Sequence, residues 1–238
     1  YFQACKGGAH GDFHLIVLAP NSVQEMHDHV ALGFDLAFKY RNPALILADG
    51  AIGQMMEKVV LPPQRPRMTE EELRARCPWA ACGKGDRKNR NIITSLEMDS
   101  TRMEQNNLRF QETYRLIEEN EVRYQACYTY DAEYLIVAFG SVARICLKAI
   151  EEAREKGIKV GLLRPITLWP FPKEAIGKLS EQVKGILTVE LNAGQMIEDV
   201  RLAAECRVPV HHFGRMGGMI PNPTEILEAL VTKLSIAQ

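Results

Sequence analysis

Short apolar runs alternate with longer amphipathic stretches four times between Asp131 and residue 238. The apolar runs are typical of buried strands: YLIVAFG (134–140), IKVGLLR (158–164), GILTVEL (185–191) and VPVHHF (208–213). Helical spacing follows each of them, over 141–156, 173–183, 195–206 and from Pro223 onward. Strands that alternate with helices form a parallel-dominated sheet covered on both faces. This half of the chain therefore predicts an α/β fold.

The first sixty residues contain one more strand-helix-strand unit. Its strands are HLIVLA (14–19) and ALILAD (44–49), and Ser22 with Glu25 three positions later predicts a capping box at the start of the helix. We expect this helix to bury an apolar stripe formed by Val23, Met26, Val30, Phe34 and Ala37. Such a unit has little surface to bury alone, so we expect residues 1–60 to be the back part of a larger parallel domain, with its front part upstream or on a partner.

Residues 61–103 have a different composition, with four prolines, nine basic residues and few apolar positions. They predict a linker, in which Thr69 and Glu72 mark the start of one short helical turn. A longer amphipathic helix is expected over 103–123. The predicted organisation is residues 1–60, a linker with helices over 61–124, and a second domain over 125–238.

Composition excludes several classes of protein. A net charge of −1 and a pI near 6.7 provide no field that would gather nucleic acid, and no apolar run approaches the ~20 residues of a membrane helix. The six cysteines lack framework spacing, which favours reduced thiols and a cytoplasmic location. Cys77 and Cys82 form a single pair, short of a zinc or cluster signature, so we expect no metal site in this chain.

The segment CKGGAHGD (5–12) is the best candidate site in the first sixty residues. Gly7 and Gly8 let the backbone approach a ligand, while Lys6, His10 and Asp12 supply a cation, a titratable base and a carboxylate. Polar side chains in such a turn also often bond only to their own backbone. Asp49 follows a strand, at the end of a sheet where ligands bind, although a polar strand exit accounts for it equally well.

Four turns in the second half are further candidates. The turn before Ser141 suits a phosphate, with Arg144 nearby, but a glycine followed by a serine cap is the favoured interpretation. In LLRPITLWPFP (162–172) the prolines require an extended path, and Trp169 and Phe171 suit an interface. Asn192 and Gln195 form a polar turn that caps a helix or contacts a partner, and GRMGGMIP (214–221) predicts a close-packed loop with Arg215 as a contact residue.

Three phrases, LLRPITLWPFP (162–172), VELNAGQMIEDVR (189–201) and FGRMGGMIP (213–221), resemble the α chain of the 2-oxoacid:ferredoxin oxidoreductases. The resemblance implies the C-terminal portion of that chain: the end of a thiamine-pyrimidine-type α/β domain, then a transketolase C-terminal-like, three-layer α/β/α domain. HGD (10–12) and VELNAGQ (189–195) look closer to the multi-subunit 2-oxoisovalerate and 2-oxoglutarate members, and 2-oxoisovalerate is favoured.

The resemblance also implies a chemistry. The family decarboxylates a 2-oxoacid oxidatively on thiamine diphosphate, makes acyl-CoA and reduces ferredoxin; the cofactor carries the reaction. It implies that Lys6, Gly7, Gly8, His10, Asp12 and Asp49 face substrate or cofactor. Thiamine diphosphate with Mg would lie at an interface with another subunit, and [4Fe-4S] clusters would lie on β, γ or ferredoxin-like δ subunits, none in this chain. The glutamate that binds the aminopyrimidine has no counterpart here, so activity of the chain alone is not expected.

Two other readings of the sequence stay open. One is a subunit of a different thiamine enzyme, either transketolase-like or a 2-oxoacid dehydrogenase β chain, which would not reduce ferredoxin. The other is a non-catalytic assembly module, in which replacement of His10 and Asp12 would leave turnover unchanged. Besides the other oxidoreductase subunits, a second copy of this chain is an expected partner, as a homo-oligomer.

Overall fold

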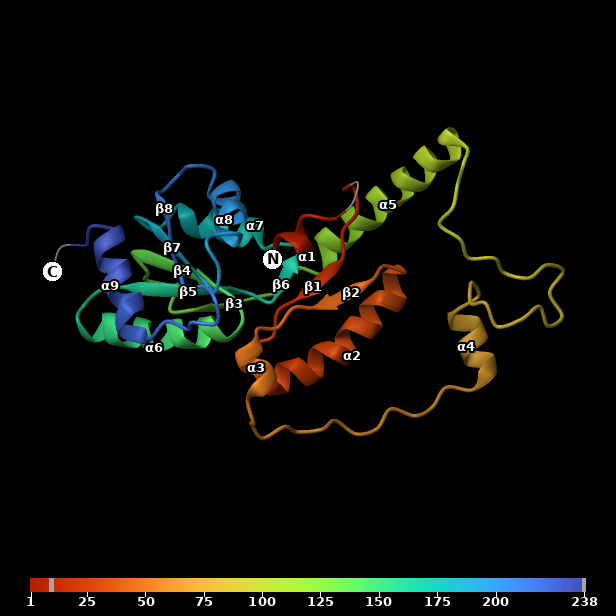
Figure 1. The fold of residues 1–238 in the computed structure, drawn as a ribbon, viewed down its shortest axis with the longest axis horizontal. Helices are drawn as coiled ribbons and strands as arrows, with labels where there is room; N and C mark the ends of the chain where they lie inside the picture. Colours follow the sequence, from red (N-terminus) through yellow and green to blue (C-terminus); the bar gives the residue numbers. More distant parts are fainter. Residues whose placement is uncertain (9–10, 237–238) are drawn as a thin grey trace. The chain divides into compact units, whose positions relative to one another are not determined.

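The computed structural model describes residues 1–8 and 11–236 (Figure 1). Two compact units are present. One combines Tyr1–Val59 with Phe110–Gln238, and the other is the intervening segment, Val60–Arg109. The division at 60 and 124 predicted from sequence stays a prediction.

The first unit contains a three-stranded sheet with the strand order β2-β1-β6. Strands β1 (Ile16–Leu18) and β2 (Ala44–Ile46) are parallel and are joined by α2 (Val23–Tyr40), which confirms the predicted strand-helix-strand unit. The third strand, β6 (Thr167–Trp169), comes from the distant proline-rich segment and runs antiparallel to β1. The sheet therefore joins residues that are about 150 positions apart. In the sequence, the short helix α1 (Phe2–Cys5) precedes β1, and the short helix α3 (Gly50–Gln54) follows β2.

Helix α2 begins as predicted but buries a different face. The Ser22 side chain accepts a hydrogen bond from the Glu25 N–H, at 3.1 Å. The predicted capping box is only half formed, because the Glu25 carboxylate accepts from the Asn21 N–H, at 2.9 Å, in place of the Ser22 N–H. The predicted apolar stripe is wrong, because Val30 is 47% and Phe34 is 65% exposed. The buried residues of the helix are instead His29, Gly33 and Leu36. Gly33 faces the side chains of Ala44 and Ile46 on β2, so the helix packs on the sheet through this face.

The second sheet has five strands in the order β3-β5-β4-β7-β8. Four of them are parallel and match the predicted runs: β4 (Tyr134–Ala138), β5 (Val160–Pro165), β7 (Ile186–Glu190) and β8 (Val210–Gly214). The edge strand β3 (Tyr124–Cys127) is antiparallel to β5 and was not predicted.

Helices cover both faces of this sheet, which confirms the predicted α/β fold class. Figure 1 shows α6 (Ser141–Glu155) and α9 (Pro223–Lys233) packed together on one face, with α7 (Lys173–Ser180) and α8 (Met196–Ala204) on the other. Each pair encloses its own apolar core with the inward side chains of the strands. The result is a three-layer α/β/α arrangement.

The segment Val60–Arg109 contains α4 (Glu70–Arg76) and the start of α5 (Ser100–Asn120). The predicted Thr69 and Glu72 cap is confirmed as a full capping box on α4. Cys77 and Cys82 are both free thiols. Within the described ranges no group of three or more His, Cys, Asp or Glu side chains is placed to hold a metal ion.

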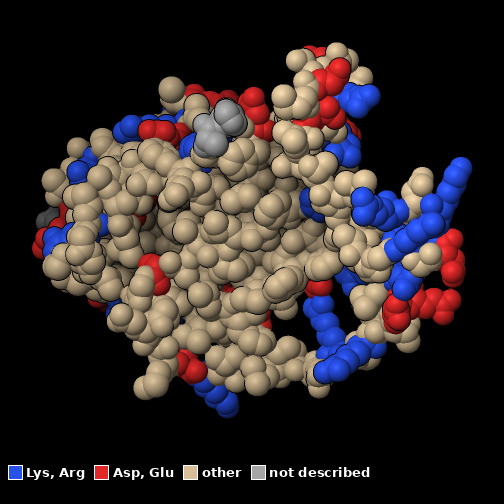
Figure 2. Space-filling view, turned by 45° about the vertical axis from the view of Figure 1, so that its right-hand side comes forward, with Lys and Arg blue, Asp and Glu red and all other residues tan. Residues whose placement is uncertain are grey.

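Surface charge bears on binding to nucleic acid, and the hydropathy of the helices bears on insertion into a membrane. On the face in Figure 2, lysine and arginine side chains occur beside aspartate and glutamate side chains and do not form a field of one sign. Among the helices of the described residues, none combines the length and the apolar character needed to cross a membrane.

Candidate functional site

A cavity of about 250 Å³ lies at the carboxyl ends of strands from both sheets, and we term it the carboxyl-edge cavity. In the five-stranded sheet, β4 lies between β5 and β7, so the chain order reverses at its carboxyl end. Open α/β sheets bind ligands at such a switch point. Residues from both sheets and from the N-terminus line the cavity: Tyr1, Leu47, Ala48, Asp49, Phe139, Gly140, Leu191, Asn192 and Gln195.

The Asp49 carboxylate binds two helix N-termini at this edge. One oxygen accepts a hydrogen bond from the Ile52 N–H at 3.1 Å, and this caps α3. The other accepts from the Ser141 N–H, at the start of α6, at 2.9 Å. An anion bound to free N–H groups at a helix start is a common ligand arrangement. Here a side chain of the chain itself takes that position and joins the two sheets.

The turn at Gly140 is shaped for this contact. Gly140 has φ +68°, and a Cβ there would lie 3.0 Å from the Asp49 carboxylate. The expectation that Ser141 caps α6 is wrong, since its hydroxyl is buried and makes no hydrogen bond. The Asp49 carboxylate supplies the cap that the serine does not. Arg144, one turn along α6, pairs with Glu57 at 2.7 Å and adds a second ionic contact between the two sheets.

Glu190 organises the neighbouring turn and was missed by sequence reasoning. Its side chain is fully buried at the end of β7, and its carboxylate accepts hydrogen bonds from the N–H groups of Gln195, Met196 and Ile197 at 2.8 to 3.1 Å. These are N–H groups of the first turn of α8, which have no partner within the helix. The signal for this role was present, because a carboxylate closes an otherwise apolar strand five residues before a helix.

The polar turn that follows Glu190 folds on itself. The Asn192 side chain accepts from the Gly194 N–H at 2.8 Å, so it shapes the turn and leaves the cap of α8 to Glu190. His212 Nε2 lies 3.9 Å from the Glu190 carboxylate and makes no hydrogen bond. Burial lowers the pKa of His212, against the opposing pull of Glu190. A Cβ at Gly214 would overlap the Asn192 carbonyl oxygen, so β8 ends against this turn.

The N-terminal residues are held to α8 by contacts that involve two predicted site residues, Lys6 and Gln195. The Lys6 ammonium pairs with Asp199, and the Tyr1 hydroxyl donates to the same carboxylate at 2.5 Å. The Gln195 side chain accepts from the Phe2 N–H at 3.1 Å. Lys6 and Gln195 thus hold α1 against α8.

Other predicted residues of the glycine-rich loop (6–12) are not gathered into one cluster. Gly7 has φ +78° in a turn. Asp12 is exposed, and its carbonyl oxygen accepts a hydrogen bond from Gln111. His10 lies outside the described residues. The substrate-facing role of this loop therefore stays a prediction.

Trp169 and Phe171 are buried within the chain. The predicted extended path is confirmed, with β6 followed by a cis peptide bond before Pro170. The Trp169 ring stacks on His14 with centroids 4.5 Å apart, and the edge of Tyr114 completes the cluster. Phe171 packs in the core beneath α7 and α8. These side chains connect the two sheets, and a contact with another chain stays a prediction.

The loop at 214–221 is not close-packed, contrary to the prediction. Met216 and Met219 are exposed, and only the end of the loop is buried. Arg215 makes an ion pair with Glu225 at 3.3 Å, on the first turn of α9. Gly217 and Gly218, both at positive φ with open space around them, permit the turn in this exposed part of the loop.

Two family models match the chain over adjoining ranges. Residues 2–130 match the pyruvate flavodoxin/ferredoxin oxidoreductase, thiamine diphosphate-binding model. Residues 132–226 match the pyruvate:ferredoxin oxidoreductase core domain II model. The boundary between them falls just before β4, where the parallel part of the five-stranded sheet begins.

Individual relatives agree with these models. The ketoisovalerate oxidoreductase subunit VorB of Methanothermobacter marburgensis is 45% identical over 230 residues, which is 97% of this chain and 63% of that protein. The 2-oxoglutarate synthase subunit KorA of Methanocaldococcus jannaschii is 31% identical, over 95% of this chain and 66% of its own length. The chain thus spans less than two thirds of these relatives.

A solved structure agrees with the fold. The 2-oxoglutarate:ferredoxin oxidoreductase from Magnetococcus marinus superposes with a TM-score of 0.77 at 22% identity, covering 98% of this chain and 44% of that one.

Proposed function

Because this chain belongs to the pyruvate flavodoxin/ferredoxin oxidoreductase family, we propose that it is part of a subunit of a 2-oxoacid:ferredoxin oxidoreductase that acts on 2-oxoisovalerate. The enzyme would convert the 2-oxoacid to acyl-CoA and reduce ferredoxin. The observation that carries the proposal is the 45% identity to a ketoisovalerate oxidoreductase subunit over nearly the whole chain. The lower identity to 2-oxoglutarate synthase subunits, about 31%, makes 2-oxoglutarate the second candidate substrate.

The buried carboxylates of this chain do not fit the pyrimidine contact of thiamine diphosphate. That contact needs a glutamate free to bind a ring nitrogen. Of the residues that the structure describes, two carboxylates are buried, Glu121 and Glu190. The Glu190 carboxylate already accepts hydrogen bonds from three N–H groups, and the Glu121 carboxylate accepts from Lys39, Tyr40 and Arg123. We therefore assign no buried carboxylate of this chain to the cofactor.

The proposal assigns this chain one wall of a composite site. The glycine-rich loop (6–12) would border the substrate, and the joint made by Asp49 and Ser141 would fix the loop-bearing sheet on the second domain. Thiamine diphosphate with Mg, and the iron-sulfur clusters, would be held mainly by other segments or subunits. CoA, ferredoxin and a cytoplasmic location belong to the same proposal.

The test is an assay of the assembled complex. The full-length subunit that contains these residues is co-expressed with the other oxidoreductase subunits, and reduction of a viologen dye is measured with thiamine diphosphate, Mg, CoA and either 2-oxoacid. We expect kcat/KM for 2-oxoisovalerate to exceed that for 2-oxoglutarate at least tenfold. Acyl transfer to lipoyl groups alone, without dye reduction, would refute the proposal.

Substitutions in the glycine-rich loop distinguish a subunit that takes part in catalysis from a non-catalytic assembly module. His10→Ala and Asp12→Ala should each lower kcat/KM in the complex, whereas Asp28→Ala, an exposed carboxylate on α2, should leave it unchanged. Unchanged kinetics in both loop variants would assign this chain to assembly.

A further inference from the structure

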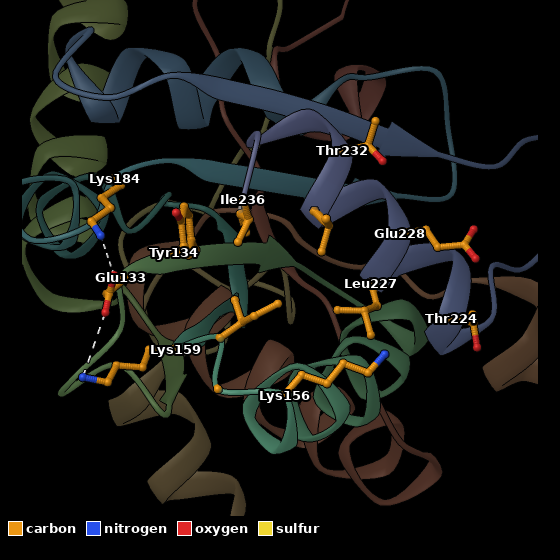
Figure 3. Close-up of a pocket in the computed structure, with 13 residues that line it drawn as sticks. Glu133, Tyr134, Lys156, Lys159, Lys184, Thr224, Leu227, Glu228, Thr232 and Ile236 are labelled. Carbon is orange, nitrogen blue, oxygen red and sulfur yellow. Dashed lines mark hydrogen bonds and ion pairs between the residues drawn. The ribbon is translucent and has the colours of Figure 1, made fainter. Parts of the chain in front are cut away.

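A second cavity, of about 810 Å³, opens at the amino ends of the strands in the five-stranded sheet, and we term it the amino-edge cavity. It is lined by the residues that precede β4, β5 and β7 and by one side of α9 (Figure 3). The carboxyl-edge cavity lies at the other end of the same strands, so the amino-edge cavity has no part in that site. Its volume falls within the ~300–1,000 Å³ usual for small-molecule sites.

The walls of the amino-edge cavity divide into an apolar side and a basic side. Leu227 and Val231 of α9, with Ile236 and Ile158, supply apolar surface. The rest of the lining is mostly polar and contains three lysines and two glutamates, an excess of one positive charge: Lys156, Lys159, Lys184, Glu133 and Glu228. A molecule with an apolar body and an anionic head matches both sides.

On the basic side, Glu133 makes ionic contacts with two of the lysines. Figure 3 shows this side chain between two lysines, with Lys184 Nζ at 2.5 Å and Lys159 Nζ at 4.0 Å from its carboxylate. The hydrogen bond from Lys184 holds the pKa of Glu133 below its ordinary value, so the carboxylate is ionised at neutral pH. One carboxylate cannot neutralise two ammonium groups, so this pair of lysines keeps a net positive charge. Lys156, at the end of α6, lies apart from the pair, beside Leu227 (Figure 3).

We propose that the amino-edge cavity binds an alkyl carboxylate, with its head among these lysines and its tail against α9. The head would compete with Glu133 for Lys159 and Lys184. The tail would cover Val231 and Ile236, which the fold leaves partly exposed at the cavity wall. Burial of such apolar surface contributes about 25 cal/mol per Å².

Isothermal titration of the 238-residue chain with octanoate tests the proposal. Octanol carries a comparable tail without the charge, and acetate carries the charge without the tail. We expect saturable binding of octanoate, at least tenfold weaker binding of octanol and acetate, and weakening in 0.5 M salt, because the lysine contacts are screened. Methyl NMR should place the shifts on Leu227, Val231 and Ile236.

Two variants change octanoate binding in opposite directions, which a purely structural role of these side chains would not produce, and a third variant is the control. Lys184→Gln should weaken octanoate binding at least fivefold, whereas Glu133→Gln should strengthen it about threefold, because it removes the competing carboxylate. Lys178→Gln, an exposed lysine on α7 outside the cavity, is the matched control. Equal affinity for octanol and octanoate, weaker binding in Glu133→Gln, or shifts confined to other parts of the chain would each overturn the proposal.

Discussion

Replacing Glu190 with glutamine should destabilise the fold strongly, although the change is nearly isosteric. The carboxylate is buried and accepts from three N–H groups at the start of α8. A glutamine side chain offers one acceptor oxygen in place of two. Its NH2 group is a hydrogen-bond donor and would face backbone N–H groups that are also donors. At least one N–H of the first turn would then lose its acceptor inside the protein.

The magnitude follows from the contacts that are lost. A hydrogen bond to a charged group contributes about 1.5–3 kcal/mol, and a buried N–H left without an acceptor adds a similar penalty. Loss of the anion from the helix N-terminus removes about 0.5 kcal/mol more. We expect the free energy of unfolding to fall by about 3 kcal/mol. With a urea m-value of about 2–3 kcal/mol/M, the midpoint should fall by about 1 M.

Urea unfolding followed by circular dichroism measures this change. Glu205→Gln is the matched control, because Glu205 is exposed at the end of the same helix and pairs only with nearby Arg207. It should shift the midpoint by less than about 0.2 M, as expected of an exposed ion pair. Hydrogen exchange should also accelerate at the amides of 195–197 in Glu190→Gln. A midpoint equal to that of the control variant would refute this account of the α8 cap.

Three other substitutions or treatments have defined outcomes. Arg164 is almost fully buried and makes two hydrogen bonds to Glu25, at 2.7 and 2.8 Å, so Glu25→Gln should lower the free energy of unfolding by about 3 kcal/mol at pH 7. Burial disfavours the charged form of Glu25, but the hydrogen bonds from Arg164 and from the Asn21 N–H, together with the charge of Arg164, outweigh it and hold the pKa of Glu25 below the ordinary value of 4.5. The pair therefore stabilises the fold above pH 4.5 and loses that contribution as pH falls through the folded-state pKa, so Glu25→Gln should flatten the acid side of a stability profile. Gly140→Ala should cost about 2 kcal/mol in thermal or urea unfolding through its positive φ and its contact with Asp49, whereas Gly53→Ala, with open space around it, should be neutral. Burial raises the pKa of the Cys146 thiol, so iodoacetamide at pH 8 should leave it unmodified by mass spectrometry while exposed cysteines are alkylated; modification of Cys146 in the folded chain would contradict its burial.

Local pattern was enough to predict the parallel strands and most helix starts. The caps at Ser22 and Thr69 depend on side chains within three residues, and the parallel strands are apolar runs that need no knowledge of their neighbours. The resemblance to a family added the order of the two domains. These features involve contacts close in sequence, so the sequence exposes them directly.

The remaining features depend on contacts between distant residues. The buried face of α2 is the one that packs on β2 through Gly33, and it differs from the apolar stripe through Phe34. The place of β6 beside β1 depends on pairing across about 150 residues. Asp49 was singled out for its position after a strand, but its partner Ser141 lies 92 residues away. The spacing of apolar residues within one segment carries no information about a contact with a distant segment.

The joining of β1 with β6 also determines how the chain would respond to a break. Residues before Val60 and after Arg109 belong to one compact unit, held by strand pairing, by Asp49 and by the ion pair of Glu25 with Arg164. A protease cut within 60–109 would thus yield two polypeptides that elute together under native conditions and separate only in denaturant. The same arrangement would allow these pieces to be encoded as two genes and still assemble.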